Sequence, residues 1–208
     1  MCFSLKASLA SSFLLFIIAY FCIKKNKDTN KWALSLIPFF FAIQQLVEAG
    51  VWLTFDYNLN IKLRLLLSYI FLLFAFIIWP VWMPFSFLKL ETNKLKHKIL
   101  KMLFFFGLML ASYLTVNFFI NSLTVKVDCN HIVYDIIVIN NLNDFVKILI
   151  YFVPTITPFF ISSFKKAKFF GLLATVSLIF SYLFFKYAAT SVWCFFCALF
   201  SSLVYFII

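Results

Sequence analysis

Charged residues and glycines are scarce in this chain. Only 12% of its 208 residues are charged, and it contains three glycines and five prolines. A soluble domain usually carries about 25% charged residues. This chain therefore lacks the polar shell that its 65% hydrophobic content would need in water. The shortage of glycine and proline also excludes collagen-like and low-complexity segments. The composition excludes an ordinary soluble domain, and lipid is the expected solvent.

The apolar stretches have the length of membrane-spanning helices. Lipid offers the backbone no hydrogen-bond partners, so only helices and closed barrels span it. Barrel strands alternate apolar and polar residues, whereas the apolar runs here are continuous over the roughly 17–25 residues of a helical span. We expect a single domain, residues 1–208, that is an all-α integral membrane bundle of seven transmembrane helices. The predicted spans are 5–23, 32–54, 65–88, 99–120, 146–164, 169–185 and 192–208.

The cationic residues predict how the spans are oriented. A net charge of +11 would indicate nucleic-acid binding in a soluble protein, but the lysines gather between the spans, so no nucleic-acid partner is expected. Twelve of the 18 Lys and Arg residues follow odd-numbered spans. Because cytoplasmic loops are enriched in Lys and Arg, we expect the N-terminus outside and the C-terminus in the cytoplasm, with the lipid bilayer as partner. The six on the opposite side are Lys6, Lys62, Arg64, Lys126, Lys147 and Lys186.

The longest linker, residues 121–145, follows the fourth span and is expected on the outer face. Two stretches rich in β-branched residues, 124–127 and 131–139, flank the turn-forming run Asp128-Cys129-Asn130. A small hairpin that caps the bundle would use these residues, and so would a loop that lies on the lipid headgroups. Both alternatives stay open at this point.

Short motifs spread over nearly the whole chain are similar to those of one family. They are Met1-Cys2-Phe3-Ser4, Gln45 with Glu48 and Trp52, Trp79-Pro80-Val81-Trp82, His131 with Tyr134 and Asp135, and Ser191-Val192-Trp193-Cys194-Phe195-Phe196. In order and spacing they resemble an uncharacterised bacterial family of multi-pass membrane proteins, a domain of unknown function whose members begin with these first four residues. The resemblance implies a bacterial inner-membrane location and no established activity. The chain departs from the family pattern at Gln44, which is commonly histidine, and at Cys197, which is commonly alanine.

A carboxylate lies within the second predicted span. Glu48 is about six residues below the outer end of that span, roughly 9 Å at 1.5 Å per residue. Gln44 and Trp52 share its helix face, and Gln45 adjoins that face. An ionisable residue inside a span is costly and is by default a functional-site candidate. The structural alternatives are an ion pair with a lysine near the outer ends of spans one and six, or a neutral acid bonded to a glutamine.

Groups that bind soft metals are predicted to meet at the outer face. In the seven-span topology Cys2 precedes the first span, His131 lies in the long linker and Cys194 opens the last span. Cysteine, histidine and carboxylate ligands suit zinc, iron or copper as a cofactor. The candidate metal ligands are Cys2, Glu48, His131 and Cys194, and the residues expected to line the site are Gln44, Gln45, Trp52, Tyr134, Asp135, Trp193 and Cys197.

Two further hypotheses remain. Cys194 and Cys197 form a CxxC pair in the predicted first turns of a helix, where the helix dipole favours thiolate, so thiol–disulfide exchange is the second hypothesis. The even set Cys2, Cys129, Cys194 and Cys197 is also compatible with structural disulfides outside the membrane. A non-enzymatic transporter or assembly component is the third. No HExxH, GxSxG or phosphate-binding glycine loop is present, so the sequence assigns no enzyme class.

Overall fold

The computed structural model describes residues 4–128, 130–136 and 143–208. Over these residues the chain is an all-α protein with one small two-stranded sheet. Six of the described helical segments are long and apolar enough to cross a membrane, as expected of a multi-pass membrane protein. They are Leu5–Lys25, Trp32–Asp56, Ile61–Leu90, Lys94–Ile120, Lys165–Phe184 and Lys186–Phe206.

Several of these segments are built from shorter helices. Helix α1 (Leu5–Lys25) begins at Ser4, whose hydroxyl accepts a hydrogen bond from the backbone N–H of Ala7 at 3.3 Å and so caps the first turn. The remaining helices are α2 (Trp32–Ser35), α3 (Ile37–Asp56), α4 (Ile61–Leu73), a π-helical turn (Phe74–Ile78), α5 (Trp79–Leu90), α6 (Lys94–Ile120), α7 (Asp144–Thr155), α8 (Thr157–Ile161), α9 (Lys165–Phe184), a 3-10 turn (Lys186–Ala188), α10 (Ala189–Ser201) and a second 3-10 turn (Ser202–Phe206).

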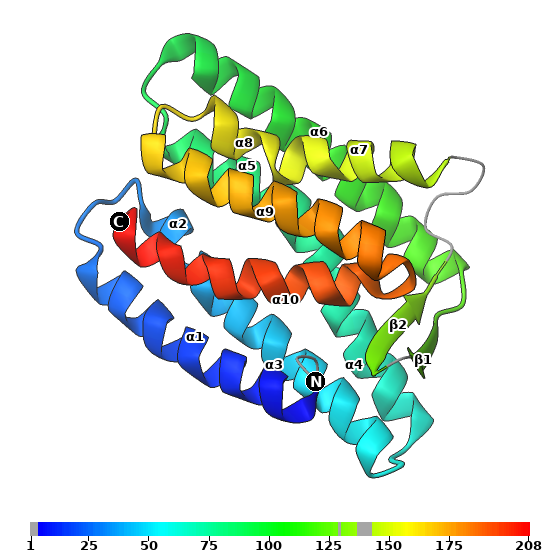
Figure 1. The fold of residues 1–208 in the computed structure, drawn as a ribbon. Coiled ribbons are helices and arrows are strands. Elements are labelled where there is room, and N and C mark those ends of the chain that lie inside the picture. The colour runs from blue at the N-terminus through cyan, green and yellow to red at the C-terminus, as the bar shows by residue number, and fades with distance from the viewer. Residues whose placement is uncertain (1–3, 129, 137–142) are drawn as a thin grey trace.

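The fifth predicted span, 146–164, is not one continuous helix. Helices α7 and α8 are separated at Ile156, with Pro154 inside α7 and Pro158 in the first turn of α8. Proline lacks an N–H and clashes with the carbonyl four residues earlier, so it interrupts a helix. Neither piece is long enough to count among the six spans, although Figure 1 shows the pair running alongside α6 from one end of the bundle to the other. A seventh span stays a prediction.

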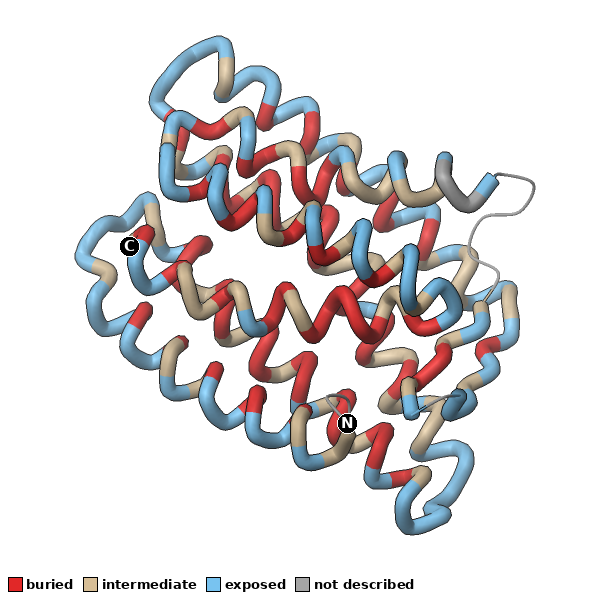
Figure 2. Tube along the Cα trace, viewed as in Figure 1, coloured by how far each residue is buried: buried red, intermediate tan, exposed pale blue. Residues whose placement is uncertain are grey.

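Helices α3 and α10 form the centre of the bundle. Buried positions are concentrated along them in Figure 2. In the segment that contains α3, 61% of the span is buried inside the protein, against 22% for the segment formed by α6. The polar residues predicted on the second and last spans therefore lie on the two most enclosed elements.

The links between helices gather at two ends (Figure 1). The basic end, as we call it, carries the links 26–31, 91–93 and 162–164, and the last described residues return there. Two lysines form hydrogen bonds between elements at this end. Lys25, at the end of α1, donates to the carbonyl of Tyr205 in the last 3-10 turn, and Lys96, in the first turn of α6, donates to the hydroxyl of Ser163. The opposite end, called the hairpin end, carries the link 57–60, the two strands and the 3-10 turn before α10.

The long linker contains a β-hairpin. Strands β1 (Thr124–Asp128) and β2 (His131–Asp135) pair antiparallel, with Thr124 opposite Asp135 and Asp128 opposite His131. Asn130 adopts a φ of 62°, a left-handed conformation that asparagine tolerates better than most residues. The hairpin packs against α4 and α10. Its position on the outer face of a membrane remains a proposal.

The π-helical turn before Pro80 leaves one backbone carbonyl without its usual donor. The N–H of Trp79 donates to the carbonyl of Phe74, five residues earlier. In the same pattern the carbonyl of Ala75 would need the nitrogen of Pro80, which carries no hydrogen. The hydroxyl of Tyr151, on α7, donates to that carbonyl instead. A hydrogen bond thus joins α7 to the third span at the π-helical turn of that span.

At the basic end, Glu91 joins two links. One carboxylate oxygen accepts from the backbone N–H of Ser163 at 2.8 Å, and the other accepts from the hydroxyl of Ser163 at 2.9 Å and from the N–H of Asn93 at 3.0 Å. Burial alone would raise the pKa of Glu91, but these hydrogen bonds and the nearby Lys96 outweigh it and hold that pKa below its ordinary value. The carboxylate therefore stabilises the fold in its charged form.

We expect Glu91→Gln to lower the free energy of unfolding at neutral pH by about 1–2 kcal/mol, because hydrogen bonds to a charged acceptor become neutral ones. A group whose folded-state pKa is lowered stabilises the protein above its unfolded pKa, about 4.3 for glutamate. That contribution is lost as the pH falls through the folded-state value. Unfolding measured in detergent between pH 7 and pH 3 should therefore show a shallower acid loss in the variant. The exposed Asp56→Asn is the control, and an unchanged acid profile in Glu91→Gln would contradict this role.

Candidate functional site

The carboxyl group of Glu48 is held by two hydrogen bonds in the centre of the bundle. Glu48 is 2% exposed. Its Oε2 accepts from Nε2 of Gln45 at 3.1 Å, one turn earlier on α3, and its Oε1 accepts from the hydroxyl of Ser191 on α10. One of the predicted structural alternatives, a hydrogen bond between Glu48 and a glutamine, is thus present. The partner on α10, Ser191, was not among the predicted site residues.

The neighbouring glutamines are buried and only partly satisfied. Trp79 Nε1 donates to Gln44 Oε1 at 2.9 Å, which links the second span to the third. Gln44 Nε2 and Gln45 Oε1 are buried and make no hydrogen bond of normal geometry with the described residues. Buried polar atoms almost always have a partner. A donor and an acceptor therefore stand beside Glu48 with unused hydrogen-bonding capacity.

Cys194 lies next to this polar cluster, but not where the sequence placed it along the helix. Helix α10 begins at Ala189, three residues before the predicted boundary, so Cys194 sits in the second turn, where the dipole effect has weakened. It is 3% exposed, its thiol lies beside the Gln44 side chain, and Glu48 is near enough to act on it through charge. The predicted start of this helix is therefore three residues too late, and the helix dipole acts less strongly on Cys194 than expected.

The described cysteines are all free thiols. Cys22, Cys194 and Cys197 are buried and unpaired. Cys2 and Cys129 lie outside the described residues. Both belong to the predicted disulfide set, and Cys2 also belongs to the predicted metal site. Cys194 and Cys197 are thus two unbonded cysteines on α10, three residues apart.

The hairpin places one tyrosine against the cluster. The ring of Tyr134, on β2, stacks on Phe71 of α4 with centroids 4.8 Å apart. Its hydroxyl is buried and has no hydrogen-bond partner within the described ranges. Burial raises the pKa of Tyr134 well above its ordinary value, and negative charge on Glu48 or Cys194 would raise it further. The hydroxyl therefore keeps its proton and remains a donor.

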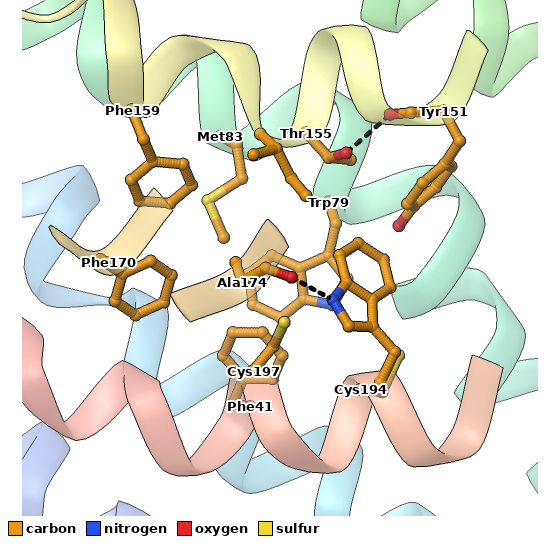
Figure 3. A pocket seen from close by; sticks show the side chains of 12 residues that line it. Phe41, Trp79, Met83, Tyr151, Thr155, Phe159, Phe170, Ala174, Cys194 and Cys197 are labelled. Carbon is orange, nitrogen blue, oxygen red and sulfur yellow. Dashed lines mark hydrogen bonds between the residues drawn. The ribbon is translucent and has the colours of Figure 1, made fainter. Parts of the chain in front are cut away.

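A small aromatic cavity lies on one side of Cys194. It has a volume of about 30 Å³, enough for a single water molecule. Figure 3 shows its wall, in which the thiol of Cys197 points from α10 towards the α9 backbone at Ala174. Trp193 Nε1 donates to the carbonyl of Ala174 at 3.0 Å and closes one side. The predicted lining residues Trp193 and Cys197 both belong to this cavity.

A much larger cavity lies on the other side of Cys194, below the hairpin. It has a volume of about 660 Å³ and is bounded by both strands of the hairpin, the π-helical turn, α6, α7, the end of α9, the 3-10 turn after it and the start of α10. Tyr151, Trp193 and Cys194 line both cavities and so form the wall between them. The predicted site residues Tyr134 and Asp135 also line the large cavity.

The four predicted metal ligands are not brought together among the described residues. No group of three His, Cys, Asp or Glu side chains arranged to hold a metal ion occurs in the ranges 4–128, 130–136 and 143–208. Glu48 and Cys194 are neighbours, whereas the ring of His131 packs on Phe185 with centroids 4.7 Å apart. Trp52, on the Glu48 helix, packs with Ile132 of the hairpin. The arrangement is a polar cluster with a cavity beside it.

Three residues that organise the site were missed by sequence reasoning. Ser191 binds Glu48, Trp79 binds Gln44, and Tyr151 forms the wall between the cavities. Ser191 is one turn before Cys194, so the spacing i, i+3 already places both on one helix face. Tyr151 offered no such signal, because its partner is a carbonyl that is freed only by the π-helical turn.

Comparison with known proteins identifies a family and no activity. The model of a family of unknown function, DUF6629, matches residues 1–208, so the chain belongs to that family. The expectation of an uncharacterised family is confirmed. No curated protein and no solved structure matches the chain.

Proposed function

For this member of a family without an assigned activity, we propose a multi-pass membrane protein that binds a single-chain amphipathic molecule in the large cavity, in contact with Cys194. The observation that carries the proposal is the position of this cavity. Its wall contains Cys194 and Tyr134, and directly behind them lies the buried cluster around Glu48. Small-molecule sites are typically cavities of about 300–1,000 Å³ with mostly apolar walls and a few polar groups. The 660 Å³ cavity has that size and that composition.

The unused polar atoms support a ligand rather than a purely structural cluster. A bundle in lipid gains little from a buried carboxyl group, which costs a few kcal/mol to insert. Here the cluster also holds Gln45 Oε1 and the Tyr134 hydroxyl without partners in the described part of the chain, and Gln44 Nε2 has only the weak acceptor of the Cys194 thiol beside it. A polar group of a bound molecule, or ordered water that accompanies it, can satisfy such atoms.

We also propose that the hairpin end faces the outside of a bacterial inner membrane and that the basic end faces the cytoplasm. The basis is the positive-inside rule, because twelve lysines follow the odd-numbered spans. On this orientation α7 and α8 together act as the seventh crossing. The Cys194 and Glu48 cluster then lies close to the outer face, and the ligand enters from the outer leaflet or from outside.

Thiol–disulfide exchange is a second candidate. The observation in its favour is that Cys194 and Cys197 are one turn apart and line the same small cavity as free thiols. A Cys194–Cys197 disulfide in protein isolated without reductant would support it. A zinc, iron or copper site is a weaker alternative, since it depends on Cys2 joining Glu48 and Cys194.

The proposed function predicts that a ligand shields Cys194. In variants that keep a single cysteine, Cys194 should react with N-ethylmaleimide faster than Cys22, which is fully buried and lines neither cavity. Saturating oleate or oleyl alcohol should slow the reaction of Cys194 by about fivefold or more and leave that of Cys22 unchanged. The rates are measured by intact mass on protein in lipid nanodiscs. If neither amphiphile slows the reaction of Cys194, the large cavity is not a binding site for such molecules.

A further inference from the structure

Three lysines from distant parts of the chain line the large cavity. They are Lys126 on β1, Lys147 in the first turn of α7 and Lys186 between α9 and α10. The described lining residues also include one acid, Asp135. The polar lining is therefore biased towards positive charge at the hairpin end.

The sequence assigns six Lys and Arg residues to the side opposite the twelve that follow odd-numbered spans. These three lysines are half of those six. The other three are Lys6, Lys62 and Arg64. Arg64 donates to Thr54 at 2.9 Å and 3.2 Å, lies over the ring of Phe55 and does not line the cavity. Lys6 and Lys62 are exposed and do not line the cavity. Half of these six cations therefore line one cavity.

The remaining lining is apolar and reaches into the bundle. It includes Ala75, Phe76, Leu110, Leu114, Ile148 and Leu178, contributed by the π-helical turn and by α6, α7 and α9. Helix α6 is also the least enclosed of the six spans. An elongated apolar chain can therefore lie between these helices, while a headgroup stays at the lysines.

From this distribution we infer that the large cavity selects a long-chain carboxylate, with the carboxylate at Lys126, Lys147 and Lys186 and the acyl chain between α6 and α7. The inference rests on the proposed function and adds the charge of the ligand. A carboxylate only accepts hydrogen bonds, and lysine ammonium groups only donate them. Charge-assisted bonds of this kind are about twice as strong as neutral ones. The volume suits one acyl chain of a fatty acid.

The test compares oleate with oleyl alcohol, which has the same chain and no charge. Affinities are measured by the shielding of Cys194 in nanodiscs of phosphatidylcholine. Oleate should bind at least tenfold more tightly, and its advantage should shrink as ionic strength rises. Each of Lys126→Gln, Lys147→Gln and Lys186→Gln should reduce the advantage severalfold, and the triple variant should abolish it. Lys62→Gln is the matched control and should behave as the wild type.

The outcomes separate the two proposals. Equal affinity for oleate and oleyl alcohol, unaffected by salt or by the lysine variants, would overturn the carboxylate and leave the amphiphile site intact. Absence of shielding by both would overturn both proposals. Nanodiscs that contain phosphatidylglycerol provide a further arm, because displacement of oleate by that lipid would show that the lysines serve a phospholipid headgroup instead. The salt dependence of the unmodified protein keeps the test decisive even if the triple variant fails to fold.

Discussion

Glu48→Leu is expected to destabilise the protein by about 2–4 kcal/mol, whereas Glu48→Gln should cost less than about 1 kcal/mol. Leucine removes the acceptor of the Ser191 hydroxyl and of Gln45 Nε2. Each buried donor left without a partner costs about 1–3 kcal/mol, and hydrogen bonds between membrane helices lie at the lower end of such values. Glutamine keeps one carboxamide oxygen as an acceptor, and its N–H groups can donate to the Ser191 oxygen.

A double-mutant cycle isolates the bond between α3 and α10. Ser191→Ala alone should cost about 1–2 kcal/mol, and the combination Glu48→Leu with Ser191→Ala should cost clearly less than the sum of the single changes. The free energies are obtained from reversible unfolding in mixed detergent micelles. Additive effects would contradict the hydrogen bond as the link between the helices. A Glu48→Leu protein of normal stability would show that the carboxyl group contributes nothing to the packing of α3 against α10.

Gly107→Ala is expected to lower stability by about 3 kcal/mol or more. A Cβ atom at this position would overlap the carbonyl oxygen of Pro80 and lie 2.9 Å from its carbon. The obstacle is backbone, so α5 and α6 must separate to admit one methyl group. Overpacking usually costs about 1–3 kcal/mol even where side chains can move aside, and close helix contacts in membranes depend on such small residues.

Gly50→Ala is the matched control for this change. There the added Cβ atom meets only the end of the Leu67 side chain, at 3.1 Å, and alanine gains about 1 kcal/mol of helix propensity over glycine. We expect a change of less than about 1 kcal/mol. The comparison uses melting temperatures in one detergent. Equal behaviour of the two variants would mean that α5 and α6 are not in close backbone contact at Pro80.

The helical character of the spans could be predicted because it depends on composition and run length alone. The predicted ends agree closely for α1, which was expected at 5–23 and lies at Leu5–Lys25, since Ser4 caps one end and lysines follow the other. The helix break at Ile156 could not be located from the sequence. Two prolines four residues apart, Pro154 and Pro158, can each interrupt the helix, and the sequence does not say at which of them it breaks. The early start of α10 was missed because Ala189 and Thr190 carry neither a cap nor an apolar signal.

The site could be predicted in part. Glu48, Gln44 and Gln45 were found because polar residues are rare in spans, and Cys194 was found as part of a motif. The described residues do not bring the predicted metal ligands together. The prediction had considered only how deep each residue lies in the membrane. Depth places residues in one plane and says nothing about their separation within it. The large cavity was not predicted, because its lining comes from helices, turns and strands that are far apart in the sequence.

Binding of a long-chain carboxylate in the large cavity would be seen in an electron-density or cryo-EM map of the full chain in lipid, prepared with oleate. Elongated density is expected in the cavity between α6 and α7, with its polar end near Lys126, Lys147 and Lys186 and its side against Cys194. An empty cavity, or one filled by the protein's own side chains under saturating oleate, would contradict it.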